Sequence, residues 1–136
     1  MIKGVPMTFD KRGALMEVTI PGMNKIQGKV RDIYDLGDKM LIIVTDRLSA
    51  FDVIMDDGVP GKGKVLNSIS TFWFRKFADL CPNHLISADI KDYPAPFNTM
   101  SELQNRSMLV RKLKVVPYEC IVRGYLTGSG WAEYKK

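Results

Sequence analysis

A glycine followed by two cations at alternate positions forms the first segment that could do chemistry. It reads Gly28-Lys29-Val30-Arg31 and lies in a pattern typical of a β-strand. A glycine inside a strand often marks a place where the backbone approaches a ligand closely. Alternate residues of a strand point to one face, so Lys29 and Arg31 could lie together over a polyphosphate. An exposed strand face with solvated charges would give the same pattern.

The second segment, residues 45–52, places polar side chains directly after an apolar run and ends in a carboxylate. A loop held by a rigid strand is where proteins commonly present binding groups. Asp46, Arg47 and Ser49 could instead form a local ion pair within a turn. Asp52 lies between two apolar residues, and its carboxylate could face a metal ion or a substrate cation.

A glycine- and lysine-rich loop, the third segment, precedes a helical pattern. Lys62 and Lys64 alternate with glycines, and apolar residues at helical spacing begin at Val65. A flexible backbone together with the free N–H groups at a helix start can bind an anion. Loops of this composition are also common without a ligand.

The fourth segment lies near the end of the sequence. Glu119 and Arg123 share one face if residues 118–125 form a strand. A Gly-Ser-Gly helix start that contains Ser129 follows, and a guanidinium beside helical N–H groups suits a phosphate monoester. A structural Glu119–Arg123 pair with Ser129 as the helix N-cap fits the spacing equally well.

Strands and one long helix must position these four segments. The patterns predict an α+β fold, an antiparallel sheet with a packed helix. The sequence has no regular crossover helices, no Gly-x-Gly-x-x-Gly after a strand and no Walker A motif, which argues against a Rossmann fold. The predicted strands are residues 26–34, 39–45, 51–55, 108–116 and 118–125, and the predicted helices are about 64–80 and from 128 onward.

The chain has the size and composition of one globular domain. Its 136 residues are 46% apolar and 26% charged, ordinary values that exclude a disordered chain. No apolar stretch approaches the roughly 18 residues of a membrane span, and the start has no apolar signal segment. We therefore expect a cytoplasmic protein without a membrane partner.

The charge balance favours anionic partners. The formal charge is +5 and the pI is near 9.2. Nucleic-acid binders tend to gather Lys and Arg in a stripe, whereas here basic residues are interleaved with acidic ones and several sit beside glycines. This arrangement favours small anions over nucleic acid.

The two cysteines and the single histidine are expected to be structural. Cys81 and Cys120 lie far apart among apolar neighbours, which predicts buried free thiols rather than a disulfide. Together with His84 they make no zinc spacing.

In their order along the chain, the four segments strongly resemble the phosphoribosylaminoimidazole-succinocarboxamide synthase family, also called SAICAR synthetase. Residues 28–34 are similar to its glycine-rich hairpin, residues 45–52 to its Asp-Arg-x-Ser-Ala-Phe-Asp element, and residues 61–67 to the loop before its long helix. Residues 117–129 match one of the family's two signatures nearly position by position. The resemblance covers about residues 26–136.

This resemblance implies an ATP-dependent ligase of purine biosynthesis. ATP would phosphorylate the carboxylate of carboxyaminoimidazole ribotide, and the amine of L-aspartate would displace the phosphate to form SAICAR, with ADP as the other product. The implied partners are these three small molecules and Mg²⁺, with no nucleic acid. The implied fold is the amino-terminal domain of the family, with an ATP cleft of the ATP-grasp or kinase-like kind.

The resemblance also assigns roles to individual residues. The ATP site would take Gly28, Lys29 and Arg31 over the phosphates, with Val30 and Val44 beside the adenine. The other assignments are Arg123 and Ser129 for the ribotide 5′-phosphate, Asp52 and Glu119 for the reacting carboxylate and its Mg²⁺, and Ser49, Lys62 and Lys64 for a loop that binds aspartate or phosphate.

The family's second signature, Asp-x-Lys-(aromatic)-Glu-Phe-Gly, is missing from this sequence. Residues 1–136 are therefore interpreted as the amino-terminal nucleotide- and ribotide-binding portion, without the carboxy-terminal half. We expect this chain alone to lack ligase turnover and to expose apolar faces that would meet the other half. Two alternatives are a nucleotide-binding module without ligase activity and a basic nucleic-acid-binding domain that is supported only by charge.

Overall fold

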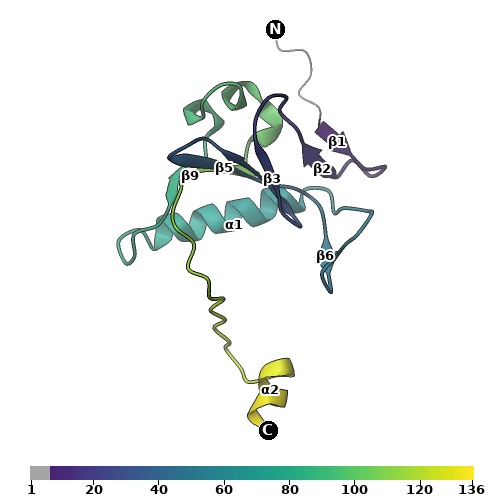
Figure 1. Cartoon of the computed structure of the whole chain (residues 1–136), viewed down its shortest axis with the longest axis vertical. Helices are drawn as coiled ribbons and strands as arrows, with labels where there is room; N and C mark the ends of the chain where they lie inside the picture. The colour runs from purple at the N-terminus through teal and green to yellow at the C-terminus, as the bar shows by residue number, and fades with distance from the viewer. Residues whose placement is uncertain (1–6) are drawn as a thin grey trace.

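A five-stranded antiparallel sheet forms the centre of the molecule. The computed structural model describes residues 7–136. The sheet has the order β3-β4-β5-β9-β8, and its neighbouring strands are antiparallel. The strands are β3 Lys25–Gln27, β4 Arg31–Asp35, β5 Lys39–Val44, β9 Ser107–Arg111 and β8 Leu85–Ser87. With one long helix packed on the sheet, the predicted α+β class is confirmed (Figure 1).

One face of the sheet carries the hydrophobic core. Tyr34 and Leu41 are directly paired on β4 and β5, so their fully buried side chains lie on the same face. The Tyr34 ring packs against Phe97 with ring centroids 5.2 Å apart. This face is covered by the hairpin of β1 Met7–Phe9 and β2 Leu15–Val18, and by the 3-10 turns η1 Ile90–Asp92, η2 Phe97–Thr99 and η3 Ser101–Leu103. In Figure 1 these turns lie across the sheet from α1.

Helix α1 (Lys62–Lys76) packs on the other face through small and polar residues. Its buried positions are Gly63, Asn67 and Thr71, which recur every four residues along one side. A Cβ at Gly63 would overlap the carbonyl oxygen of Val44, so the helix backbone lies directly against β5. The predicted helix is confirmed, although it ends earlier than residue 80.

The apolar stripe of α1 is largely exposed instead of facing the sheet. Trp73 and Phe77 are each 45% exposed, and Ile69 is 50% exposed. Helical spacing of apolar residues therefore located the helix but did not mark the side that packs on β5 and β9. The exposure agrees with the expectation that this chain shows apolar faces to solvent.

Residues 26–34, predicted as one strand interrupted by Gly28, form two strands. β3 and β4 pair as an antiparallel hairpin, and residues 28–30 form the turn between them. The predicted common strand face for Lys29 and Arg31 is therefore wrong, because Lys29 lies in the turn and Arg31 begins β4.

The predicted strand at residues 51–55 is also a hairpin. β6 (Ser49–Ala50) pairs with β7 (Val53–Ile54). Phe51 and Asp52 connect them with φ values of 50° and 65°, left-handed conformations that reverse the chain. Asp52 is thus an exposed turn residue, where a position within a strand was expected.

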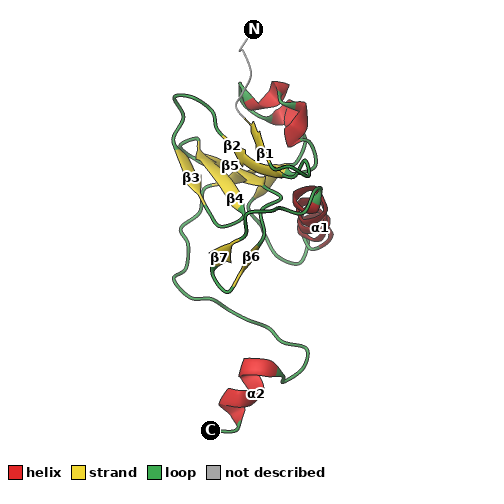
Figure 2. Ribbon diagram, turned by 90° about the vertical axis from the view of Figure 1, so that its right-hand side faces the viewer, coloured by secondary structure: helices red, strands yellow, loops and turns green. Residues whose placement is uncertain are grey.

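Residues 112–127 form an extended arm with neither helix nor strand, so the predicted strand at 118–125 is wrong. Pro117 lacks a backbone N–H, and no neighbouring strand pairs with this segment in the described chain. Figures 1 and 2 show the arm leading away from the sheet to α2 (Gly128–Tyr134), whose predicted start is confirmed.

Cys81 and Cys120 are free thiols, but both are exposed. The expectation that they are buried is wrong, because Cys81 follows the end of α1 and Cys120 lies on the arm. Within residues 7–136, no helix has the length and apolar character needed to cross a membrane.

Candidate active site

Backbone hydrogen bonds close the turn between β3 and β4. The amide of Gly28 donates to the carbonyl of Arg31 at 2.7 Å. Thr45, directly after β5, donates from its amide and its hydroxyl to the carbonyl of Val30 at 3.1 and 2.9 Å. These contacts bring the first two sequence segments, residues 28–31 and 45–52, side by side.

The buried guanidinium of Arg47 lies against this turn. Its Nε donates to the carbonyl of Lys29 at 3.0 Å. Its Nη2 donates to the carbonyls of Gly28 and Arg31 at 2.9 and 3.1 Å, and its Nη1 donates to the carbonyl of Met16. The sequence analysis gave Arg47 no role in the site. A buried arginine is rare without such partners, but the sequence carried no sign of burial here.

Two buried ion pairs replace the local Asp46–Arg47 pair considered from the sequence. Asp32 accepts from Arg47 at 3.0 Å, with both side chains at most 4% exposed. Asp46 lies 3.3 Å from Arg106. The predicted local pair is wrong, because each side chain reaches a distant partner of opposite charge in the folded chain.

The carboxylate of Asp46 occupies the amino-terminal turn of α1. It accepts from the amide of Gly63 at 2.7 Å and from the amide of Leu15 at 3.0 Å. Burial alone would raise the pKa of Asp46, but these N–H groups and the charge of Arg106 outweigh burial and lower the pKa below its ordinary value. The Gly63 N–H, which the sequence pattern offers to a substrate anion, is therefore already in use.

Ser49, Lys62 and Lys64, predicted to share a loop site, lie in different surroundings. Lys62 turns inward and its Nζ donates to the carbonyl of Arg47 at 3.0 Å, and burial lowers its pKa. Lys64 is exposed and borders a cavity of about 260 Å³. Ser49 is half-buried on β6.

Asp52 forms an ion pair with Lys29, which joins the β6–β7 turn to the β3–β4 turn. The hydrogen bond from Lys29 holds the pKa of Asp52 below its ordinary value. Their side chains are 87% and 58% exposed, so the pair contributes little to stability. It does place a carboxylate and an ammonium group beside residues 28–31.

The residues predicted for Mg²⁺ do not build a metal site on their own. Within residues 7–136, no three His, Cys, Asp or Glu side chains come together in a group that could hold a metal ion. Asp52 is engaged by Lys29, and Glu119 is exposed on the arm.

A cavity of about 220 Å³ lies between the sheet and α1, next to the β3–β4 turn. Val30 and Val44, the two valines predicted to lie beside an adenine, both line it. The other lining residues are Arg31, Ile42, Leu66, Asn67, Ser70, Phe74, His84 and Met108. The cavity is thus mostly apolar with a cation at one side, a lining typical of small-ligand sites.

His84 forms part of the wall of this cavity. Its ring packs on Phe74 with ring centroids 5.0 Å apart, and its Nε2 is buried without a hydrogen-bond partner. Burial, together with the charges of Arg111 and Arg31, lowers the pKa of His84. The sequence predicted a structural role for His84 but not its position beside Val30 and Val44.

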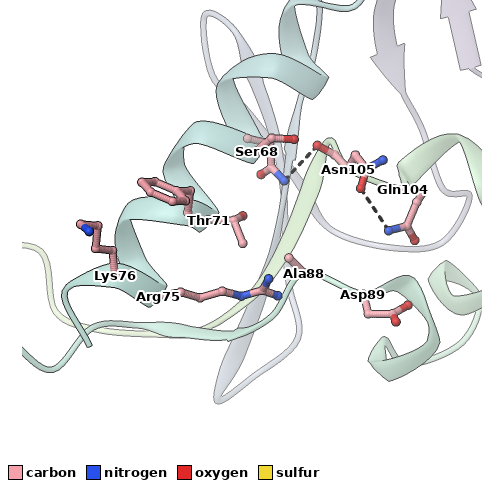
Figure 3. Close-up of a pocket in the computed structure, with 10 residues that line it drawn as sticks. Ser68, Thr71, Arg75, Lys76, Ala88, Asp89, Gln104 and Asn105 are labelled. Carbon is pink, nitrogen blue, oxygen red and sulfur yellow. Dashed lines mark hydrogen bonds between the residues drawn. The ribbon is translucent and has the colours of Figure 1, made fainter. Parts of the chain in front are cut away.

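A larger cavity of about 640 Å³ lies on another side of α1 (Figure 3). Its lining includes Arg75, Lys76 and Asp89, and Asn67 borders both cavities. The Asn67 Nδ2 donates to the carbonyl of Asn105 at 3.1 Å. None of the residues predicted for the site lines this larger cavity.

Arg123 and Ser129 meet at the end of the arm. Arg123 Nη2 donates to the Ser129 hydroxyl at 3.3 Å. No ion pair joins Glu119 to Arg123 in the described residues, and α2 has Thr127 as its N-cap, so both structural alternatives for this segment are wrong. A shared cleft with Lys29 is also absent, because the arm leads away from the sheet (Figures 1 and 2).

Sequence comparison decides the family. The family model described as SAICAR synthetase matches residues 24–136, a range that contains all four segments. The chain belongs to the SAICAR synthetase family. The phosphoribosylaminoimidazole-succinocarboxamide synthase of Geobacter sulfurreducens is 61% identical over 110 residues, which are 80% of this chain and 37% of the relative. That of Syntrophotalea carbinolica is 52% identical over 126 residues, which are 90% of this chain and 42% of the relative.

Solved structures of SAICAR synthetases have the same fold as this chain. One, described as SAICAR synthase, has a TM-score of 0.79 and 42% identity over 89% of this chain and 44% of its own. Another is the enzyme from Saccharomyces cerevisiae complexed with SAICAR, with a TM-score of 0.77 and 41% identity over 88% of this chain and 44% of its own. The chain therefore spans less than half the length of the SAICAR synthetases it matches.

Proposed function

We propose that residues 1–136 are the nucleotide- and ribotide-binding portion of an ATP-dependent ligase. The whole enzyme would join L-aspartate to the carboxylate of carboxyaminoimidazole ribotide and release SAICAR, ADP and phosphate. Family membership supports this reaction, because the relatives carry the name of the synthase that performs it. The residues of this chain support a nucleotide site at the sheet and a ribotide site at the end of the arm.

The observation that carries the nucleotide assignment is the 220 Å³ cavity behind the β3–β4 turn. Val30 and Val44 offer it apolar walls, which suit the flat faces of an adenine. Residues 28–31 lie at its edge, where Lys29 and Arg31 are exposed cations. An adenine in the cavity would bring the ATP phosphates toward this turn.

Neutralisation of phosphate charge is the chemistry expected of the turn. Phosphoryl transfer requires positioning and stabilisation of charge on the transferred group, with little covalent chemistry from the protein. Lys29 would exchange its exposed partner Asp52 for a phosphate oxygen. Mg²⁺ would arrive with ATP as part of the substrate.

Arg123 and Ser129 support the ribotide assignment. A planar guanidinium and a hydroxyl 3.3 Å apart can both donate to one phosphate monoester. Arg123 lies on the arm and Ser129 in α2 at its end, so a common site with the nucleotide requires the arm to approach the cavity. Glu119 lies on the same arm and is assigned to the reacting carboxylate.

Isothermal titration of the chain with MgATP tests the nucleotide assignment. We expect a dissociation constant of about 1 mM or tighter, the range of ordinary enzyme substrates. Val44→Phe would fill the cavity and weaken binding at least about tenfold. Val18→Phe is the matched control, because Val18 is also buried but belongs to the core on the other face of the sheet. Equal affinities for the two variants would refute the cavity as the nucleotide site.

A further inference from the structure

Arg47 contacts the carbonyl oxygens of three of the four residues 28–31, which are the β3–β4 turn and the first residue of β4. Its donors reach Gly28, Lys29 and Arg31 at 2.9 to 3.1 Å. The fourth carbonyl, that of Val30, is held by Thr45 at 2.9 Å. Every carbonyl of the turn therefore points to residue 45 or residue 47.

These contacts determine where the amides of the turn point. In a trans peptide, the carbonyl of one residue and the N–H of the next point in opposite directions. Because the carbonyls of Gly28 and Lys29 face Arg47, the N–H groups of Lys29 and Val30 face away from it. Neither N–H donates a hydrogen bond to another group within residues 7–136. Free successive amides in a turn are a known form of anion site.

We propose that Arg47 is a positioning residue that fixes the β3–β4 turn with the amides of Lys29 and Val30 directed toward the ATP phosphates. This inference rests on the proposed function, because it takes ATP as the ligand of the turn. Arg47 itself would not touch the nucleotide, since its side chain is buried behind the turn with 4% exposure.

The geometry requires arginine at this position rather than any cation. Arginine carries five N–H donors on three nitrogens in a planar fork, and here these nitrogens contact four carbonyls and the carboxylate of Asp32, with three of the five acceptors sharing Nη2. A lysine has three donors on a single nitrogen and cannot reach acceptors spread over the turn. Asp32 is held in place by the amide of Val18 at 2.9 Å, so the guanidinium is anchored from the core side.

The decisive variant is Arg47→Lys, which keeps the charge and loses the fork. Tyr93→Phe is the control, because it removes another buried hydrogen bond, from the Tyr93 hydroxyl to the carbonyl of Ser107, without contact to the turn. We expect Arg47→Lys to weaken MgATP binding about tenfold or more. We also expect lower amide order parameters at Lys29 and Val30 than in either the wild type or Tyr93→Phe.

The outcomes separate this inference from the proposed function. A folded Arg47→Lys chain with unchanged MgATP affinity or unchanged order parameters at Lys29 and Val30 overturns the role of Arg47. A wild-type chain that binds no MgATP overturns the proposed function, and the order parameters then still decide whether Arg47 orders the turn.

Wild-type dynamics provide a test that does not depend on the folding of a variant. If Arg47 fixes the turn, the amide order parameters of Lys29 and Val30 in the nucleotide-free chain will match those of rigid strands, about 0.85. Values below about 0.6 would describe a flexible turn and contradict the proposal.

Discussion

Several charged side chains are buried in this chain, and each forms an ion pair with a side chain of opposite charge. Arg47 and Asp32 are paired behind the β3–β4 turn, and Asp46 and Arg106 are paired at the start of α1. Removing one partner from a buried pair leaves an uncompensated charge, which costs far more than loss of an exposed pair. These four residues are therefore expected to be less tolerant of substitution than the exposed Lys29–Asp52 pair.

His84 gives a prediction for the pH dependence of stability. Its pKa in the folded chain is lowered by burial, so the unfolded chain takes up a proton at a higher pH than the folded chain does. The free energy of unfolding should therefore be highest above the ordinary histidine pKa of about 6.5 and fall as the pH drops below it. Because His84 is the only histidine, His84→Phe should flatten the profile between pH 7 and pH 5. Urea denaturation at each pH measures this, and a profile equally steep in His84→Phe would contradict the assignment.

At the scale of elements, the close approach of α1 to β5 organises the site. Gly63 allows this approach, Asp46 holds the start of the helix, and the cavity proposed for the nucleotide lies between α1 and the sheet. The 28–31 turn and the 45–52 segment meet at the same end of the sheet because β4 and β5 are adjacent and antiparallel.

A glycine comparison tests the importance of this approach. Gly63→Ala should destabilise the chain by about 2 kcal/mol or more, because the new Cβ would overlap the carbonyl of Val44 and lie 3.0 Å from that of Thr45. Gly124→Ala on the arm is the control, since no atom lies within 4 Å of its Cβ position. Thermal unfolding should separate the two variants clearly. Similar melting temperatures would mean that α1 does not pack as closely as described.

At the scale of the whole molecule, the described chain consists of a folded sheet-and-helix body and an arm that leaves it. The residues proposed for the nucleotide belong to the body, whereas Arg123 and Ser129, proposed for the ribotide, lie on the arm and in α2 at its end. The relatives are more than twice as long as the segment matched here. A complete ligase site would need the arm brought to the body, and the exposed side chains of Ile69 and Trp73 on α1 offer an apolar surface for additional packing.

The purified 136-residue chain is therefore predicted to produce no SAICAR. Incubation with MgATP, carboxyaminoimidazole ribotide and L-aspartate, followed by chromatographic detection of SAICAR and ADP, measures this directly. A relative of full length assayed in parallel shows that the conditions support turnover. Sustained formation of SAICAR by the chain alone would refute the division of labour proposed here.

Ligand binding by the whole chain distinguishes the proposed ligase portion from the two alternatives. A nucleotide-binding module would bind MgATP but not the ribotide, which titration of both ligands resolves. A nucleic-acid-binding domain would show affinity for generic RNA or DNA that falls steeply with salt concentration. The interleaved charges that favoured small anions in the sequence predict that such binding is weak.

Local sequence was sufficient for the family, the α+β class and the positions of β4, β5, β9 and α1. The order of the motifs identifies the family. A continuous apolar run such as β5 favours a strand through residues that are adjacent in the sequence. The family resemblance assigns Val30 and Val44 to the same ligand, and in the folded chain both line one cavity.

Only the tertiary structure decided which side of α1 packs on the sheet and which partners the buried charges take. The packed side is Gly63, Asn67 and Thr71, because close approach of two backbones favours small side chains over the apolar stripe. Arg47 and His84 acquire their roles from residues far away in the sequence, so no local pattern could reveal them. The predicted strand at residues 118–125 is absent for the same reason. A strand needs a neighbouring strand to accept and donate its backbone hydrogen bonds, and only the tertiary structure provides or withholds that neighbour.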